Sequence, residues 1–373
     1  MKNTIIQKTL AVIAALSMLC SVGCGDSGDS SSNESPKTTA SSSDSSSAEN
    51  NETTEATGEP TEAPTEAVTE AVPELSNEDR TEIQAKILSF VRGEISAEEF
   101  SDERLQYVTS LAIYGRDIVG VNCTMSHSYG AETDNGMVFT YEKTKYDFGT
   151  PQNLDVLFNQ LTSLNKLELS YTFLSDADML SSLTSLTTLD LSDNSLIDIS
   201  ALSSLTNLTS LSLMLNEDIT DFSALSSLTN LTELLLGGNS CNNLAPLSSL
   251  KNLTRLTLFS GHPEYITDIS PLSSLTNLTS LNLNDNRIID ISPLSSLINL
   301  TDLDIKGNEI SDISPLSSLV NLKSLDIRVN NIGDITALYS LKSLHSVVLS
   351  GNNIPEADIE KLKQALPDCI IEN

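Results

Sequence analysis

Few residues of this 373-residue chain have the types and spacing that chemistry requires. The three histidines, His127, His262 and His345, are not part of any ligand set with the spacing of a metal site. Cys123 and His127 could act as nucleophile and general base, but two polar residues in a loop are far more often incidental. No nucleophile elbow, zinc-protease motif or glycine-rich phosphate loop is present. We therefore expect a protein that binds rather than catalyses, with no metal or cofactor.

The charge of the chain limits its partners. It has 20 Lys and Arg against 51 Asp and Glu, a formal net charge of -31. Residues 26–75 carry -11 of this charge and residues 76–373 carry -22. Such acidity argues against a nucleic-acid partner, because neutralising phosphates needs clustered basic residues. It also disfavours electrostatic binding to anionic lipid.

The first residues have the pattern of an export signal. Lys2 and Lys8 precede an apolar run from Leu10 to Leu19, which is too short for a membrane span of about 20 residues. The sequence "SVGC" at 21–24 resembles a bacterial lipoprotein lipobox, which implies a cleaved signal over 1–23 and a diacylglycerol on Cys24. Ser21 stands where that motif prefers leucine, and the alternative is an ordinary secretory signal. We expect a lipoprotein on the outer face of a bacterial cell membrane, or a secreted protein.

A segment of low complexity follows the leader. Residues 26–75 contain 11 Ser and 8 Thr and end in "GEPTEAPTEAVTEAVPE". Almost nothing apolar is available to bury, so we expect residues 24–75 to form a disordered tether.

From residue 164 the chain repeats the phrase L-x-x-L-x-L-x-x-N. Successive first leucines are 22, 22, 23, 22, 25, 22, 22 and 22 residues apart, and nine copies at this period indicate a solenoid over 164–354. These leucines are Leu164, Leu186, Leu208, Leu231, Leu253, Leu278, Leu300, Leu322 and Leu344. The asparagine of the phrase recurs as Asn194, Asn216, Asn239, Asn286, Asn308, Asn330 and Asn352. The unit that begins at Leu253 lacks this asparagine and has three extra residues.

The physical roles within one unit can be inferred from residues 278–299. Leu281 and Leu283 alternate as a strand requires, and the amide of Asn286 can bond backbone groups of adjacent coils. Pro293 and the paired serines suit a short 3₁₀ segment. One coil cannot bury its apolar face alone, so stacked coils must share a continuous core.

This phrasing resembles the leucine-rich repeat proteins, in particular the 22-residue internalin-like class, over residues 164–373. The resemblance implies an α/β fold: a right-handed curved solenoid with a parallel sheet on the concave face and short 3₁₀ or irregular segments on the convex face. It also implies a binding module rather than an enzyme.

Both ends of the repeats have the pattern of helical caps. At 355–373, an amphipathic helix is expected over Glu356–Leu366. At 76–163, Ser76 and Ser96 each have an acidic residue three positions on, which predicts two helix starts. Residues 107–118 resemble a degenerate first strand, and the insertion at 114–150 contains the strand-like "GMVFTYEKTKYDF".

Function is expected where the copies differ. Met214, Leu215, Leu235 and Phe259 form an apolar island on an otherwise polar concave face. The three extra residues add His262 and Tyr265 beside it, and these six residues are our candidate partner site. The alternative is drift among weakly constrained repeats. Asp304, Lys306, Asp326 and Arg328 are a second candidate, although these charges could simply pair across neighbouring strands.

We therefore expect a surface-anchored binding or adhesion protein that recognises an extracellular protein or peptide through its concave face. An extracellular glycan or polymer is the alternative ligand. An enzyme built on the 114–150 insertion is the third reading, supported only by Cys123 and His127.

Overall fold

The computed structural model describes residues 76–91, 95–116, 136–142, 152–260 and 265–373. All of them lie in one compact unit, Thr69–Asn373. The expected leader, Cys24 and the tether lie outside the described residues. Within the described part of the chain, no helix has both the length and the hydrophobicity needed to cross a membrane.

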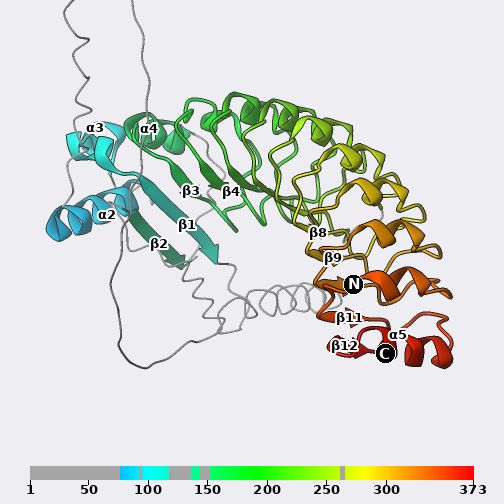
Figure 1. Cartoon of the computed structure of the whole chain (residues 1–373). Coiled ribbons are helices and arrows are strands. Elements are labelled where there is room, and N and C mark those ends of the chain that lie inside the picture. Colours follow the sequence, from blue (N-terminus) through cyan, green and yellow to red (C-terminus); the bar gives the residue numbers. More distant parts are fainter. Residues whose placement is uncertain (1–75, 92–94, 117–135, 143–151, 261–264) are drawn as a thin grey trace, which may run out of the picture. The chain divides into compact units, whose positions relative to one another are not determined.

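The repeats form a parallel sheet with one short strand per coil (Figure 1). Over the described residues the sheet has twelve strands in the order β12-β11-β10-β9-β8-β7-β6-β5-β4-β3-β1-β2. The repeat strands are β3 (Lys166–Glu168), β4 (Thr188–Asp190), β5 (Ser210–Ser212), β6 (Glu233–Leu235), β7 (Arg255–Thr257), β8 (Ser280–Asn282), β9 (Asp302–Asp304), β10 (Ser324–Asp326) and β11 (Ser346–Val348). Each strand pairs in register with its neighbours, so equivalent positions form columns across the sheet.

Opposite the sheet, each coil returns through a 3₁₀ segment (Figure 1). These segments are η2 (Asp178–Leu180), η3 (Ser200–Ser204), η4 (Ser223–Ser227), η5 (Ala245–Ser249), η6 (Ser270–Ser274), η7 (Ser292–Ser296), η8 (Ser314–Ser318) and η9 (Thr336–Ser340). In η7 the carboxylate of Asp290 accepts the Ser292 amide at 2.8 Å, Pro293 fixes the first turn, and Leu294 is fully buried. The predicted short convex segments are confirmed.

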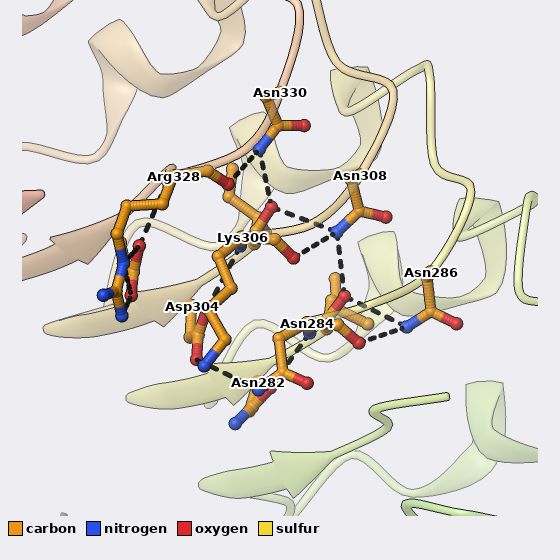
Figure 2. A network of polar contacts seen from close by, with 11 residues as sticks. Asn282, Asn284, Asn286, Asp304, Lys306, Asn308, Arg328 and Asn330 are labelled. Carbon is orange, nitrogen blue, oxygen red and sulfur yellow. Dashed lines mark hydrogen bonds and ion pairs between the residues drawn. The ribbon is translucent and has the colours of Figure 1, made fainter. Parts of the chain in front are cut away.

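The recurring asparagines bond neighbouring coils to one another, as predicted. Asn308, which is 7% exposed, donates to the carbonyls of Leu283 and Ile305 at 3.0 Å each and accepts the Ile288 amide at 3.0 Å. Asn286 and Asn330 repeat this arrangement (Figure 2). Each side chain thus satisfies backbone groups that the turn would otherwise bury without partners.

The N-terminal end of the core is covered by helices. α2 (Asn77–Val91), α3 (Ala97–Phe100), η1 (Glu103–Tyr107) and α4 (Gln152–Gln160) form this cap. Ser96 makes the expected capping box with Glu99, but the predicted second helix is a four-residue α3 followed by the separate η1. Phe90 stacks on Phe100 with ring centroids 4.0 Å apart, which joins α2 to α3.

The insertion lengthens the N-terminal edge of the sheet. β1 (Ser110–Arg116) pairs with β3 and is the expected degenerate first strand. β2 (Gly136–Glu142) comes from the insertion and pairs in parallel with the other side of β1. The insertion therefore adds an outer strand instead of separating β1 from the repeats.

The C-terminal end is closed by α5 (Glu356–Ala365) and a final strand, β12 (Ile370–Glu372). Ile359 and Leu362 of α5 are buried, as the amphipathic pattern predicts. The sequence did not predict β12.

Candidate functional site

On each repeat strand, the residues that build the core and the residues that vary between repeats occupy different positions. In most repeat strands the central residue is buried and its two neighbours are partly exposed. The buried residues, such as Leu189 and Leu281, are nearly invariant, whereas the flanking column changes between repeats. That column contains Glu168, Asp190, Ser212, Leu235, Thr257, Asn282, Asp304, Asp326 and Val348. We call the surface made by these variable positions the strand face.

The apolar island is less exposed than its sequence suggests. Met214 and Phe259 are 7% and 8% exposed, while Leu215 and Leu235 are partly exposed. Tyr265 is also partly exposed, and the Arg287 guanidinium lies 4.2 Å from the centre of its ring. His262 lies outside the described residues. The structure therefore divides the candidate site into two buried and three partly exposed side chains.

Two glycines make room for the island. A Cβ atom built on Gly237 would overlap the ring of Phe259, and one built on Gly238 would lie 2.6 Å from Cδ2 of Leu215. Gly238 also has a φ of 79°, in the left-handed region that favours glycine. Phe259 thus packs on the backbone at Gly237, just after β6, and Leu215 of the preceding coil packs on the backbone at Gly238.

A small cavity lies beside Phe259, between the coil that begins at Leu231 and the next coil, which lacks the recurring asparagine, here called the ladder asparagine. Its walls are Leu236, Asn239, Cys241, Leu258, Phe259, Ser260 and Ile266. Burial raises the pKa of the Cys241 thiol, so this group is held as a neutral thiol and not as a reactive thiolate. The interruption of the repeat thus coincides with a local change in packing.

The second candidate set forms ion pairs within single repeats. Arg328 and Asp326 are 2.6 Å apart, and Lys306 and Asp304 are 3.8 Å apart (Figure 2). Asn284 also donates to Asp304 at 3.2 Å. The sequence had suggested pairing across neighbouring strands, but each cation pairs with the aspartate two residues before it. These charges are therefore largely neutralised on the strand face.

Sequence reasoning missed the N-terminal end of the strand face. Tyr171 and Phe173 follow β3 and are each 41% exposed. Between them, Thr172 occupies the place of the ladder asparagine, and Asn194 of the next coil accepts its amide at 3.1 Å. The Tyr171 amide donates to the Ser192 carbonyl of the next coil at 3.2 Å, which places Tyr171 beside Asp193. Two aromatic residues flanking a non-asparagine in the ladder column were the signal that could have revealed this region.

The acidic groups beside these rings are poorly solvated. Burial raises the pKa of Asp193 to about 6, against hydrogen bonding from Tyr171, and Glu217 adds charge repulsion. Its Oδ2 atom is buried and makes no hydrogen bond. Burial likewise raises the pKa of Asp190, although the Ser192 hydroxyl and amide both donate to it.

Neither a metal site nor a catalytic pair can be assembled from the described residues. No group of three His, Cys, Asp or Glu side chains among the residues that the structure describes could hold a metal ion. Cys123 and His127 lie outside the described ranges. The strand face offers apolar, aromatic and charged contacts, which suit recognition of a partner.

The fold and the Asn ladder define the class: the chain is a leucine-rich repeat protein. The family model for leucine-rich repeats in two copies matches residues 162–203, 184–227, 264–296, 276–318 and 320–364. These matches leave out residues 228–263, the stretch that holds Gly237, Gly238 and Phe259.

Within this class, the solenoid is structurally similar to an internalin, inlF, from Listeria monocytogenes. The two chains are 26% identical with a TM-score of 0.54, over 78% of this chain and 87% of that one. Internalin C2 (inlC2) of the same organism is 31% identical with a TM-score of 0.39, over 53% of this chain and 83% of that one. No curated protein matches the chain.

Proposed function

We propose that this chain is an exported, surface-anchored protein that recognises a protein or peptide partner through its strand face. The observation that carries the proposal is the division of each strand into a constant buried position and variable exposed ones. In such a scaffold the exposed residues can change from repeat to repeat without disturbing the buried leucines. The exposed surface can therefore become complementary to a partner, which suits the fold to binding. The similarity to an internalin solenoid agrees with this role.

The apolar island is the proposed centre of recognition. Leu215, Leu235 and Tyr265 would contact the partner, because each is partly exposed. Met214 and Phe259 lie beneath them and would fix their positions, and His262 belongs to the adjoining insertion. Apolar side chains at the centre of a polar surface are the usual source of binding energy in protein interfaces.

Leu235 and Val348 provide a matched pair for testing the site. Both occupy the same strand column and both are partly exposed, but Val348 lies five strands away from Leu235 in the sheet. Peptides would be selected from a random display library on the immobilised chain and then measured against Leu235→Ser and Val348→Ser. We expect a loss of about ten-fold or more for Leu235→Ser and little change for Val348→Ser. Equal affinities for both variants and the wild type would refute the island.

The export and anchoring part of the proposal rests on the leader. Lys2 and Lys8, the apolar run and Cys24 have the order of a lipoprotein signal. A Cys24→Ala variant expressed in a bacterial host should leave the membrane fraction and appear in soluble or secreted material. Retention of the variant in the membrane fraction would contradict lipid attachment at this residue.

A further inference from the structure

One strand position holds an aspartate in several repeats. This aspartate forms an ion pair within its own repeat in two late repeats but not in an early repeat. Asp304 and Asp326 each accept the amide two residues on, at 3.1 Å, and the side chain of that residue is the cation Lys306 or Arg328. Asp190 occupies the equivalent position and accepts the Ser192 amide at 2.9 Å in the same way. Here a serine replaces the cation. No basic side chain among the described residues forms an ion pair with Asp190.

The charge of the surrounding repeats follows the same division. Residues 164–250 contain ten acidic residues and one basic residue, Lys166, for a net charge of -9. Lys166 is itself paired with Glu168 at 2.8 Å. Residues 251–373 contain nine basic and fifteen acidic residues, for a net charge of -6. The first repeats thus lack the cations that the later repeats place on their own strand face.

Two aromatic side chains, those of Tyr171 and Phe173, belong to the same early repeats as Asp190 and Asp193. The Tyr171 amide donates to the Ser192 carbonyl at 3.2 Å, so Tyr171 lies beside the turn of the next coil that holds Asp193, and Phe173 follows two residues later. Both rings are 41% exposed, although both residues hold left-handed φ angles of 60° and 57°. Exposed rings beside carboxylates are the chemistry that receives a guanidinium or ammonium group, through cation–π contact and charge pairing together.

From these observations we propose that the strand face around Tyr171, Phe173, Asp190 and Asp193 binds a positively charged extended segment of the partner. An arginine or lysine of that segment would take the place that Lys306 and Arg328 fill in the later repeats. We call this region the aromatic–acidic surface. The inference rests on the proposed function, since it assigns a chemical class to part of the partner, but it concerns repeats separate from the apolar island.

Replacing Ser192 with arginine would fill this place from within the chain. Ser192→Arg reproduces the arrangement of Asp326 and Arg328, so the fold has a working precedent two residues after an equivalent aspartate. The probe is a labelled synthetic peptide of alternating arginine and glycine, about ten residues long, measured by fluorescence anisotropy on the full chain. We expect Ser192→Arg to weaken its binding about five-fold or more, and Tyr171→Asn to weaken it as well without any change in net charge.

The control must add the same charge elsewhere. Ser350→Arg occupies the same column in the last repeat, where Val348 stands in place of the aspartate, so it should leave binding within about two-fold of wild type. Equal losses for Ser192→Arg and Ser350→Arg would show that only net charge matters and would overturn the proposal. Equal binding of a glutamine–glycine peptide would overturn it too.

The outcomes also separate this inference from the proposed function. Library peptides that depend on Leu235, together with an arginine peptide whose binding is unchanged by Ser192→Arg and Tyr171→Asn, would leave the function standing and refute the aromatic–acidic surface. Arginine-peptide binding that responds to Ser192→Arg, together with library peptides that bind Leu235→Ser as tightly as the wild type, would support this surface and refute the apolar island.

Discussion

At the scale of single residues, the ladder asparagine is the most demanding position in each coil. If a buried side-chain amide is removed, the backbone groups that it bonded can be left without partners. Each buried group left unsatisfied lowers the free energy of unfolding by about 1 to 3 kcal/mol. Asn308 donates to three carbonyls and accepts one amide at once. An asparagine also recurs on the opposite side of the coil, where Asn299 donates only to the Thr276 carbonyl at 2.9 Å and is exposed.

We therefore predict that Asn308→Ala lowers the free energy of unfolding by roughly 1 to 3 kcal/mol, because the buried Ile288 amide loses its partner and the carbonyls of Leu283 and Ile305 each keep only one asparagine donor. The matched Asn299→Ala should cost less than about 1 kcal/mol, since water can replace its single bond. Urea denaturation of the three proteins measures both values. Similar losses for the two variants would mean that the buried ladder has no special role.

Asp193 gives a prediction for pH. Its pKa is about 6 in the folded chain and 3.8 is its ordinary value, mainly because burial disfavours the charged form. Between these pH values the folded chain binds a proton that the unfolded chain has lost, so this residue's contribution to stability falls as pH rises. Above pH 6 the charged Asp193 carboxylate lowers the free energy of unfolding by its full amount.

Asp193→Asn should therefore raise the free energy of unfolding at pH 7, by roughly 1 to 3 kcal/mol, with an advantage that shrinks toward pH 4. Asparagine also accepts the left-handed φ of 57° at this position. Asp218→Asn, in the next coil, is exposed and serves as the control. Denaturation curves between pH 4 and 7 would contradict the prediction if the two variants changed in parallel.

At the scale of elements, the sequence predicted the strands, turns and 3₁₀ segments that recur from repeat to repeat. Leu281, Leu283 and Pro293 recur at fixed spacing, so the strand, the turn and the 3₁₀ segment follow from one coil and apply to all. β12 and the outer position of β2 could not be predicted, because each occurs once and is placed by pairing with a distant strand. A segment that occurs only once does not show from its sequence which strand it will pair with, or in which register.

The candidate site was predictable in composition but not in exposure. The sequence showed that Phe259 breaks the polar column, but it could not show that the absence of a side chain at Gly237 lets the ring pack on the backbone just after β6. The same was true of the charged pairs. A spacing of two residues predicts that both side chains lie on the same face of the sheet, but only the structure shows that Arg328 pairs with the aspartate of its own repeat. Side-chain direction, not secondary structure, was the missing information.

At the scale of the whole folded unit, a solenoid has two ends at which the core would otherwise be exposed. Each coil contacts only its neighbours, so stability is close to a sum of coil and interface terms. α5 covers the last coil with Leu362, which is fully buried, while Gln364 on the same helix is exposed. A charge at the first position must be desolvated against the core, and a charge at the second remains in water.

We predict that Leu362→Asp unfolds the C-terminal coils locally, whereas Gln364→Asp leaves them intact. In Leu362→Asp, amide hydrogen exchange should accelerate at least about ten-fold in β10, β11 and β12, because an open end lets neighbouring coils fray in turn. Exchange in β3 and β4, at the far end of the repeats, should stay within about two-fold of wild type, since no contact carries the loss that far. Equal acceleration in all strands would instead mean that the solenoid unfolds as one cooperative unit, and the partner-binding repeats could not then be varied independently of the cap.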